Sequence, residues 1–322
     1  MIKCEDKIYV AGHLGMVGSA MVRALKKRGF NNIVTRTRKE LDLVNQIDVN
    51  NFLNQEKPDY VVIAAAKVGG IYANSTYSAD FIYENLMIQC NLIHGCYAAG
   101  VNDLLFLGSS CIYPKNSIQP MKEEYLLTGE LEKTNEAYAV AKIAGLKLCE
   151  FYNRQYKTNF RSAMPTNLYG ANDNFHLENS HVIPALIRKI HEAKYNGSSE
   201  VELWGTGNSK REFLHVDDMA EACMHLINTD NDLYLKVVDQ SPCVNIGYGS
   251  DITIRDLATL IKKIVSYEGD VIFNVNMPDG TVQKLLDTTK MKTLGWAPKM
   301  ALDAGLTETY EWFLNNIENS RR

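Results

Sequence analysis

Four side chains in the first half of the chain have the types and spacing for proton and hydride chemistry. Tyr138 and Lys142 are four residues apart and lie on one face of a helix, where an ammonium can lower the pKa of a phenol. Ser109 can hydrogen-bond the same carbonyl oxygen that such a phenol protonates. These three residues predict hydride transfer between a nicotinamide and a carbonyl. Cys111 is not needed for that reaction, so it is either chemically idle or serves a second one.

The elements that must position these residues alternate regularly along the first half of the chain. Short β-rich runs, bounded by Gly, Pro or polar residues, are predicted as strands at 8–11, 33–35, 60–64, 104–107 and 161–164. Helices are predicted between them at 16–28, 47–56, 79–99 and 136–156. This alternation predicts an α/β fold, a Rossmann-like doubly wound parallel sheet. Ser109 then follows a strand end.

The pattern changes after Pro165. Residues 171–211 are predicted as a loop-rich insertion around a helix at 182–194, and 216–228 and 244–247 as a return to the sheet. The rest combines short strands with predicted helices at 254–265 and 301–315. We expect a first domain of 1–170 plus about 212–248 and a smaller mixed α/β domain of 171–211 plus 249–322. Since no repeat or low-complexity linker separates them, the two should pack tightly.

Composition excludes several other classes of function. The chain has 322 residues, 46% of them hydrophobic and 22% charged, which is typical of a globular protein with a full core. The net charge of -4 gives no electrostatic case for nucleic acid or an anionic membrane. No apolar run approaches the roughly 20 residues of a membrane span, and the polar N-terminus predicts no signal peptide. Seven scattered cysteines predict free thiols of a reducing cytoplasm and no metal site.

A glycine turn at the start of the chain predicts a dinucleotide site. Gly12, Gly15 and Gly18 follow the first strand and open the first helix, whose N-terminus also carries Met16 and Val17. Free N–H groups and the positive end of the helix dipole suit a pyrophosphate, and glycine lets the backbone approach it. The alternative is a tight turn with no ligand. The position after a strand at the N-terminus favours the cofactor.

The residues after the second strand indicate which dinucleotide binds. Arg36 and Arg38 stand where NAD-binding chains usually carry an acid for the ribose 2′-hydroxyl, and arginine suits a 2′-phosphate. The pair therefore predicts NADPH, with a solvated surface pair as the alternative. Ala64 and Ala65, after the third strand, keep the backbone open beside the cofactor.

Read together, these motifs resemble the extended short-chain dehydrogenase/reductase family over the whole chain. In that family the tyrosine protonates the carbonyl oxygen, the lysine lowers its pKa and binds the nicotinamide ribose, and the serine orients the carbonyl; here these are Tyr138, Lys142 and Ser109. The runs at 64–71, 107–114, 165–170, 179–184 and 211–218 are similar to the GDP-L-fucose synthase family. The resemblance implies a homodimer paired through helices 79–99 and 136–156.

That resemblance also implies a set of cofactor contacts. They are the glycine turn, the two arginines and residues after several strands: Gly12, Gly15, Met16, Val17, Gly18, Arg36, Arg38, Ala64, Ala65, Leu107, Gly108, Lys142, Pro165, Thr166, Asn167, Leu168 and His181. One departure weakens the case for NADPH slightly. The family usually has arginine two residues after the first glycine, where it reaches the cofactor phosphate, and this chain has Leu14.

The substrate class implied is GDP-4-keto-6-deoxymannose, whose C4 ketone acidifies the protons on C3 and C5. A base must remove such a proton and an acid must return one from the opposite face. A thiolate is a credible base because the reference pKa of about 8.5 falls beside cations, and a histidine suits the acid. The resemblance places Cys111 and His181 in these roles, with Ser109 and Tyr138 holding the enolate oxygen. The alternatives are a small buried cysteine and a histidine that caps or packs.

For the GDP half of the substrate, the resemblance points to Lys189, Trp204, Arg211 and Asp279. Arginine suits a bidentate grip on a diphosphate. Trp204 can equally fill a core, and Asp279 can belong to a plain turn.

Two competing functions remain. One is a reductase of a related GDP-4-keto-6-deoxy sugar, such as a heptose, with epimerisation lost or performed elsewhere. The other is a non-catalytic NADP-binding sensor, which we would expect to lose Tyr138 or Lys142.

Overall fold

A six-stranded parallel sheet forms the centre of the molecule. The computed structural model describes residues 2–176, 180–239, 241–277 and 279–317. The strand order is β2-β1-β3-β4-β5-β9. The bounds are β1 (Ile8–Ala11), β2 (Ile33–Val34), β3 (Tyr60–Ile63), β4 (Asp103–Leu107), β5 (Asn159–Pro165) and β9 (Val244–Ile246). Every neighbouring pair is parallel, which confirms the predicted Rossmann-like α/β fold.

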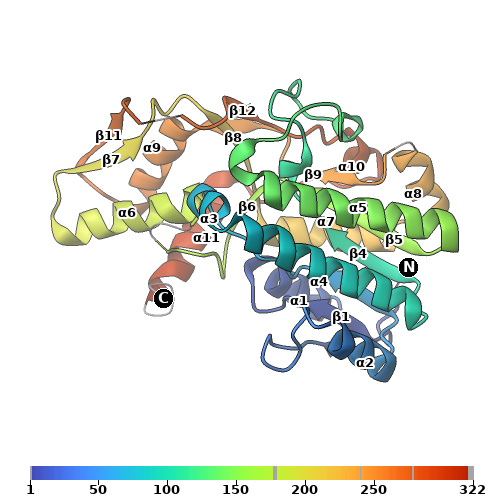
Figure 1. Ribbon diagram of the computed structural model, residues 1–322. Helices are drawn as coiled ribbons and strands as arrows, with labels where there is room; N and C mark the ends of the chain where they lie inside the picture. Colours follow the sequence, from blue (N-terminus) through green and yellow to red (C-terminus); the bar gives the residue numbers. More distant parts are fainter. Residues whose placement is uncertain (1, 177–179, 240, 278, 318–322) are drawn as a thin grey trace.

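Helices cover both faces of this sheet, as a doubly wound fold requires. Helices α1 (Met16–Lys27) and α7 (Val216–Asn228) pack on one face, and α2 (Gln46–Glu56), α4 (Ser78–Ala98) and α5 (Glu136–Tyr156) on the other. Along β1, Ile8 and Val10 enter the first core while Tyr9 and Ala11 enter the second. A strand buried on both faces reads as a continuous apolar run for this reason. Helices α4 and α5 lie side by side (Figure 1).

Most predicted bounds in the first half agree with the structure to within about two residues, the scatter expected at element ends. Short elements were missed: α3 (Ile71–Thr76), β6 (Asn167–Tyr169), and the 3-10 turns η1 (Ser110–Ile112), η2 (Glu123–Tyr125) and η3 (Lys133–Asn135). An element of three to six residues is too short to show a helical or strand period. The turn η1 carries Cys111, one of the predicted catalytic residues.

A smaller lobe is built around its own hydrophobic core. This core lies among α6 (Val182–Asn196), α9 (Ile254–Val265) and α11 (Leu302–Asn315). Strands β7 (Glu200–Trp204) and β11 (Asp270–Asn274) pair in parallel, and β8 (Lys210–His215) pairs with β6, β10 (Asp251–Thr253) and β12 (Gln283–Lys284). The sequence predicts mostly loop for 171–211, whereas the structure adds β7 and the start of β8. Figure 1 shows this lobe beside the central sheet.

Two further helices, α8 (Asn231–Val238) and α10 (Thr289–Thr293), complete the fold. Met291 and Leu294, in and just after α10, pack into the first core of the central sheet. None of the helices in the described ranges is both long and apolar enough to cross a bilayer. Within the same ranges, no three His, Cys, Asp or Glu side chains gather as a metal ion would need.

The fully buried Glu212 joins the two lobes. Its Oε1 accepts a hydrogen bond from the Gly249 N–H at 2.7 Å, and its Oε2 accepts one from the Leu286 N–H at 3.0 Å. Burial raises the pKa of this carboxyl above its ordinary value, and the backbone donors oppose that rise. Since Glu212 belongs to β8 and its donors follow β9 and β12, one side chain fixes three segments at the junction.

Candidate active site

The glycine turn between β1 and α1 is built for a ligand as well as for packing. Gly12 has φ +85°, and a Cβ on it would lie 2.7 Å from the backbone of Ala65. A Cβ on Gly18 would lie 2.1 Å from the Gly12 carbonyl oxygen. Gly15 differs, because the nearest atom to its Cβ would be 3.6 Å away. The protein's own packing therefore does not require glycine at 15, whereas a closely approaching phosphate does.

The N-terminus of α1 is open to an anion. Its N-cap is Gly15, no side chain caps the first N–H groups, and no acid lies in the first turn. These groups remain available to a pyrophosphate, which fits the cofactor implied by the sequence. Leu14, in the turn, is 68% exposed.

The two arginines after β2 have different surroundings. Arg36 donates to Glu56 Oε1 at 2.6 Å and to the Thr35 carbonyl at 2.8 Å, and its guanidinium lies 5.3 Å from the Phe52 ring centroid. The Arg38 side chain is 75% exposed, and its ion pair with Glu84 is long, at 3.6 Å. Arg36 is therefore held by the protein, whereas Arg38, with one long ion pair and a mostly exposed side chain, is the more available of the two for a 2′-phosphate.

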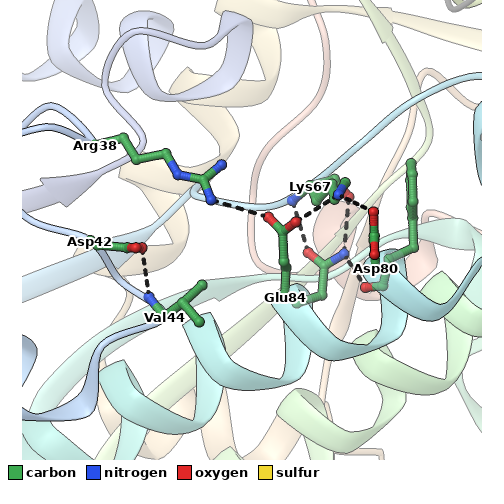
Figure 2. Close-up of polar contacts among 8 residues, drawn as sticks. Arg38, Asp42, Val44, Lys67, Asp80 and Glu84 are labelled. Atoms are coloured by element: carbon green, nitrogen blue, oxygen red, sulfur yellow. Dashed lines mark hydrogen bonds and ion pairs between the residues drawn. The ribbon is translucent and has the colours of Figure 1, made fainter. Parts of the chain in front are cut away.

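Figure 2 shows how Glu84 of α4 links Arg38 to the loop after β3. Lys67 Nζ donates to Glu84 Oε1 at 2.6 Å and to Asp80 Oδ2 at 3.2 Å. The Asn85 side chain exchanges hydrogen bonds with the Lys67 backbone, accepting from its N–H and donating to its C=O, both at 3.0 Å. These contacts fix the loop that carries Ala64 and Ala65 beside the glycine turn. No local sequence pattern indicated a role for Glu84 or Asn85.

Tyr138 and Lys142 lie on α5 as their spacing predicts. Lys142 Nζ lies 5.7 Å from the Tyr138 ring centroid, and burial lowers the pKa of this lysine to about 8. Burial raises the pKa of the Tyr138 phenol above its ordinary value, a thiolate at Cys111 raises it further, and a hydrogen bond with Ser109 opposes the rise. The net direction is the opposite of the lowering by Lys142 that the sequence predicts, because burial of the phenol outweighs the influence of the lysine, and the phenol keeps its proton at neutral pH.

Cys111 sits in η1, half-buried, with donors on two sides. The Ser109 hydroxyl oxygen accepts a hydrogen bond from the Cys111 N–H at 3.2 Å. Asn135 Nδ2 lies 3.3 Å from the Cys111 sulfur, and Lys284 Nζ lies 3.8 Å from it. Asn135 stands at the start of α5, a local signal that sequence reasoning missed. Lys284 is 173 residues away from the cysteine, so nothing in the sequence indicated this contact.

Of the five predicted catalytic residues, four lie within one neighbourhood: Ser109, Cys111, Tyr138 and Lys142. His181 is the N-cap of α6 in the smaller lobe, and its side chain accepts no capping hydrogen bond. The residue is exposed at the surface, but the protein packed around the ring lowers the pKa of His181 below its ordinary value by desolvation. The neighbouring Ser180 hydroxyl is buried without a partner in the described structure. Asn179, the first residue of the predicted run at 179–184, lies outside the described residues.

The remaining predicted cofactor residues line the carboxyl ends of β4 and β5. Leu107 ends β4 and Gly108 follows it; a Cβ on Gly108 would lie 2.3 Å from the Met164 sulfur. The Thr166 N–H donates to the Ile246 carbonyl at 3.0 Å. Asn167 and Leu168 belong to β6, and Pro165 ends β5. In doubly wound sheets this edge is where dinucleotides bind.

Three of the predicted substrate residues lie in or beside strands of the smaller lobe. Asp279 Oδ1 and Oδ2 accept from the Thr206 N–H at 2.9 Å and its hydroxyl at 2.8 Å. Arg211 donates to the Thr281 carbonyl at 2.6 Å. Trp204, two residues before Thr206, is 64% exposed and fills no core. Lys189 lies half-buried on α6.

Comparison with known proteins identifies the family. Residues 8–238 match the model of the NAD dependent epimerase/dehydratase family. GDP-L-fucose synthase 1 of Arabidopsis thaliana is 56% identical over 313 residues, which cover 97% of this chain and 94% of the relative. GDP-L-fucose synthase of Escherichia coli K12 is 54% identical over 318 residues, which cover 98% and 99%.

A solved structure agrees with these relatives. The GDP-mannoheptose C4 reductase of Campylobacter jejuni with NADP bound is 42% identical, with a TM-score of 0.88 over 98% of this chain and 100% of that one. The glycine turn, the strand-end residues and the Ser109, Tyr138 and Lys142 set are the parts of this chain that such a likeness would lead one to expect. The chain belongs to the GDP-L-fucose synthase family, within the NAD dependent epimerase/dehydratase family of extended short-chain dehydrogenases/reductases.

Proposed function

We propose that this protein converts GDP-4-keto-6-deoxy-D-mannose to GDP-L-fucose, by epimerisation at C3 and C5 followed by NADPH-dependent reduction at C4. One observation carries the proposal. The Ser109 hydroxyl hydrogen-bonds the Tyr138 phenol and also accepts from the Cys111 N–H, so a base for carbon acids and an acid for a ketone oxygen share one serine. Both groups can therefore act on the same ketone.

In the reduction, NADPH supplies hydride to C4 when it is bound. Tyr138 is protonated at neutral pH and donates its proton to the C4 oxygen, while Ser109 orients that oxygen. Lys142, with a pKa of about 8, is mostly an ammonium at pH 7 and stabilises the phenolate that remains. Its hydrogen bond to the Leu107 carbonyl keeps it in place.

In the epimerisation, the Cys111 thiolate removes the proton from C3 or C5, and an S–H bond forms as the C–H bond breaks. The electron pair moves to the C4 oxygen, where the Ser109 and Tyr138 hydroxyls stabilise the enolate. His181 returns a proton to the opposite face of the carbon. The name of the two relatives at 54% and 56% identity supports this pair of reactions.

Binding of the two ligands is divided between the lobes in this proposal. The cofactor pyrophosphate lies against the N-terminus of α1, and Arg38 meets the 2′-phosphate. The smaller lobe, 171–211 plus 249–322, takes the GDP group. Trp204 stacks on the base, Arg211 and Lys189 hold the diphosphate, and Asp279 keeps the turn after Trp204 in place.

The alternative within the same fold is C4 reduction of a GDP-4-keto-6-deoxy sugar with seven carbons. The likeness to the GDP-mannoheptose C4 reductase favours it, at 42% identity and a TM-score of 0.88. The higher identity to the synthases and the two donors at the Cys111 sulfur favour an enzyme that both epimerises and reduces its substrate.

Incubation of the enzyme with GDP-4-keto-6-deoxymannose and NADPH in D₂O tests the proposal. We expect GDP-fucose with deuterium at both C3 and C5. Oxidation of NADPH with a product that keeps protium at both carbons would leave only the reductase. With Cys111→Ser we expect the exchange to be lost while NADPH binding stays at the wild-type level, which separates a catalytic thiol from a structural one.

We propose a homodimer in the cytoplasm, paired through α4 and α5. Tyr83 on α4 and Phe151 on α5 are 58% and 44% exposed, so both helices present an aromatic side chain that a second copy could cover. All seven cysteines are free, which suits a reducing compartment. Sedimentation of the wild type against the double variant Tyr83→Glu/Phe151→Glu tests the pairing, since charges on the buried face should yield monomers.

A further inference from the structure

We propose that Lys284 and Asn135 are positioning residues that stabilise the thiolate form of Cys111, so that the base of the epimerisation is assembled by three segments of the chain. The proposal rests on the proposed role of Cys111 as that base. It assigns the two residues no direct chemistry on the sugar. Lys284 supplies a fixed positive charge, and Asn135 supplies an N–H donor.

The geometry around the sulfur carries this inference. Lys284 Nζ lies 3.8 Å from the Cys111 sulfur, and Asn135 Nδ2 lies 3.3 Å from it. Both groups are donors without a lone pair to offer, so each favours a negative sulfur over a neutral one. Since all three side chains are half-buried, their attraction is screened less than on an open surface.

The charge of Lys284 is not used elsewhere. In the ion pairs formed by residues 2–176, 180–239, 241–277 and 279–317, Lys284 does not take part, whereas Lys115 pairs with Glu132 and Lys290 with Glu124. No other hydrogen bond of its ammonium is formed within those ranges. The sulfur is therefore the acceptor to which this ammonium is directed.

The orientation of Asn135 is that of a donor. Its Nδ2 faces the sulfur, while its Oδ1 is buried and has no hydrogen-bond partner in the described structure. The reversed amide would place a lone pair against the sulfur and oppose a thiolate. Asn135 ends η3 directly before α5, so the helix that carries Tyr138 also sets the position of this donor.

The strand that carries Lys284 is tied to the segment that follows Cys111. The Leu285 N–H donates to Gln119 Oε1 at 2.8 Å, and the Leu285 carbonyl accepts from the Met121 N–H at 2.7 Å. The next residue, Leu286, donates to the buried Glu212. Backbone bonds on both sides therefore hold Lys284 at a fixed place relative to η1, although the two are distant in sequence.

The other groups facing Cys111 do not oppose this effect. From α5, the Tyr138 phenol interacts with the sulfur, and its raised pKa keeps it neutral near pH 7. From η1, Ser109 is uncharged and its oxygen accepts from the Cys111 backbone. Lys284 is thus the charged group beside the thiol in the described part of the chain.

Alkylation of Cys111 by iodoacetamide tests the inference without substrate, because the thiolate is the species that reacts. The rate at pH 7 is read by mass spectrometry of the peptide containing Cys111. We expect Lys284→Gln to slow alkylation about tenfold and Lys284→Arg to stay within about threefold of wild type, because the charge is kept. Asn135→Ala should slow it about threefold, and the double variant should be slower than either single variant.

Lys210→Gln is the matched control, since Lys210 is an exposed lysine on the neighbouring strand, paired in register with Gln283. It should alkylate at the wild-type rate. NADPH binding by each variant reports folding and should be unchanged. The inference would be overturned if Cys111 were alkylated at the wild-type rate in Lys284→Gln, or if Lys210→Gln and Lys284→Gln slowed its alkylation equally.

Proton exchange distinguishes this inference from the proposed function. Lys284→Gln should also slow C3 and C5 exchange in D₂O, whereas Lys284→Arg should keep it, because the charge is kept. If alkylation slows and exchange does not, the contact to the thiol is correct and Cys111 is not the base. If neither slows, the positioning role is wrong, while Cys111→Ser still decides the role of the thiol.

Discussion

Lys142 Nζ donates a hydrogen bond of 2.8 Å to the Leu107 carbonyl oxygen, which ties the catalytic helix α5 to the end of the central strand β4. Lys142 is 4% exposed, and its ammonium has no carboxylate beside it in the described structure; the nearest ring is that of Phe106, at 5.0 Å. Two residues after Leu107 stands Ser109. The same contact therefore sets the distance between the helix face with Tyr138 and the loop with Ser109.

Replacing Lys142 by methionine should remove activity and raise stability. Burial lowers the folded-state pKa of Lys142 from 10.5 to about 8, so the folded state binds this proton less tightly than the unfolded state. The charged lysine therefore destabilises the folded state fully below pH 8, and this destabilisation disappears as the pH rises through 10.5. Lys142→Met should thus gain at most about 3 kcal/mol in free energy of unfolding at pH 7.

Urea unfolding of the wild type and Lys142→Met at pH 7 and pH 10 measures this difference, which should shrink at the higher pH. A methionine variant less stable than wild type at pH 7 would show that the hydrogen bond to Leu107 outweighs the burial of the charge. Reduction of the substrate by Lys142→Met should fall at least about a hundredfold.

Alanine at Gly15 and at Gly18 should separate cofactor binding from folding. Gly15→Ala has room for its Cβ and a backbone that any residue adopts, so its melting temperature should stay near that of the wild type. Its NADPH dissociation constant should rise at least about tenfold, since the methyl group would lie where the phosphate approaches. Gly18→Ala clashes with the Gly12 carbonyl and should lower the melting temperature. Scanning calorimetry and fluorescence titration measure the two effects.

The two arginines after β2 should differ in their effect on cofactor choice. Arg38→Ala should raise the NADPH dissociation constant about tenfold or more and leave that of NADH unchanged, because only NADPH carries the 2′-phosphate. Arg36→Ala should instead lower stability by leaving Glu56 without this partner. Fluorescence titration with both nucleotides measures this, and equal losses for NADPH and NADH in Arg38→Ala would assign the arginine to another role.

Asp279 should act on GDP binding through the turn that follows Trp204. Thr206→Val removes the hydroxyl that donates to Asp279 Oδ2 but keeps the backbone bond, and Asp279→Ala removes both. We expect GDP affinity measured by calorimetry to fall severalfold in Thr206→Val and further in Asp279→Ala. NADPH affinity should not change in either variant. An unchanged GDP affinity in Asp279→Ala would show that this aspartate is only a structural residue of the turn and does not affect GDP binding.

Local sequence patterns were enough to predict the sheet, the glycine turn and the Tyr138–Lys142 pair. These features are local, because strand and helix periods, a turn before a helix and an i, i+4 pair are all set within a few residues. Apolar side chains of β1 alternate between the two faces of the sheet, and in the sequence they form a continuous apolar run.

Other features of the site depend on how distant segments of the chain pack together, and no local pattern contains them. Lys284 lies beside Cys111 although the two are 173 residues apart. Arg36 pairs with Glu56, whereas Arg38 stays exposed. Trp204 faces the solvent. Each outcome depends on which strands become neighbours and on which donors then lie within hydrogen-bonding distance of an acceptor. Those choices follow from long-range packing and hydrogen bonding, which a linear pattern of residue types does not encode.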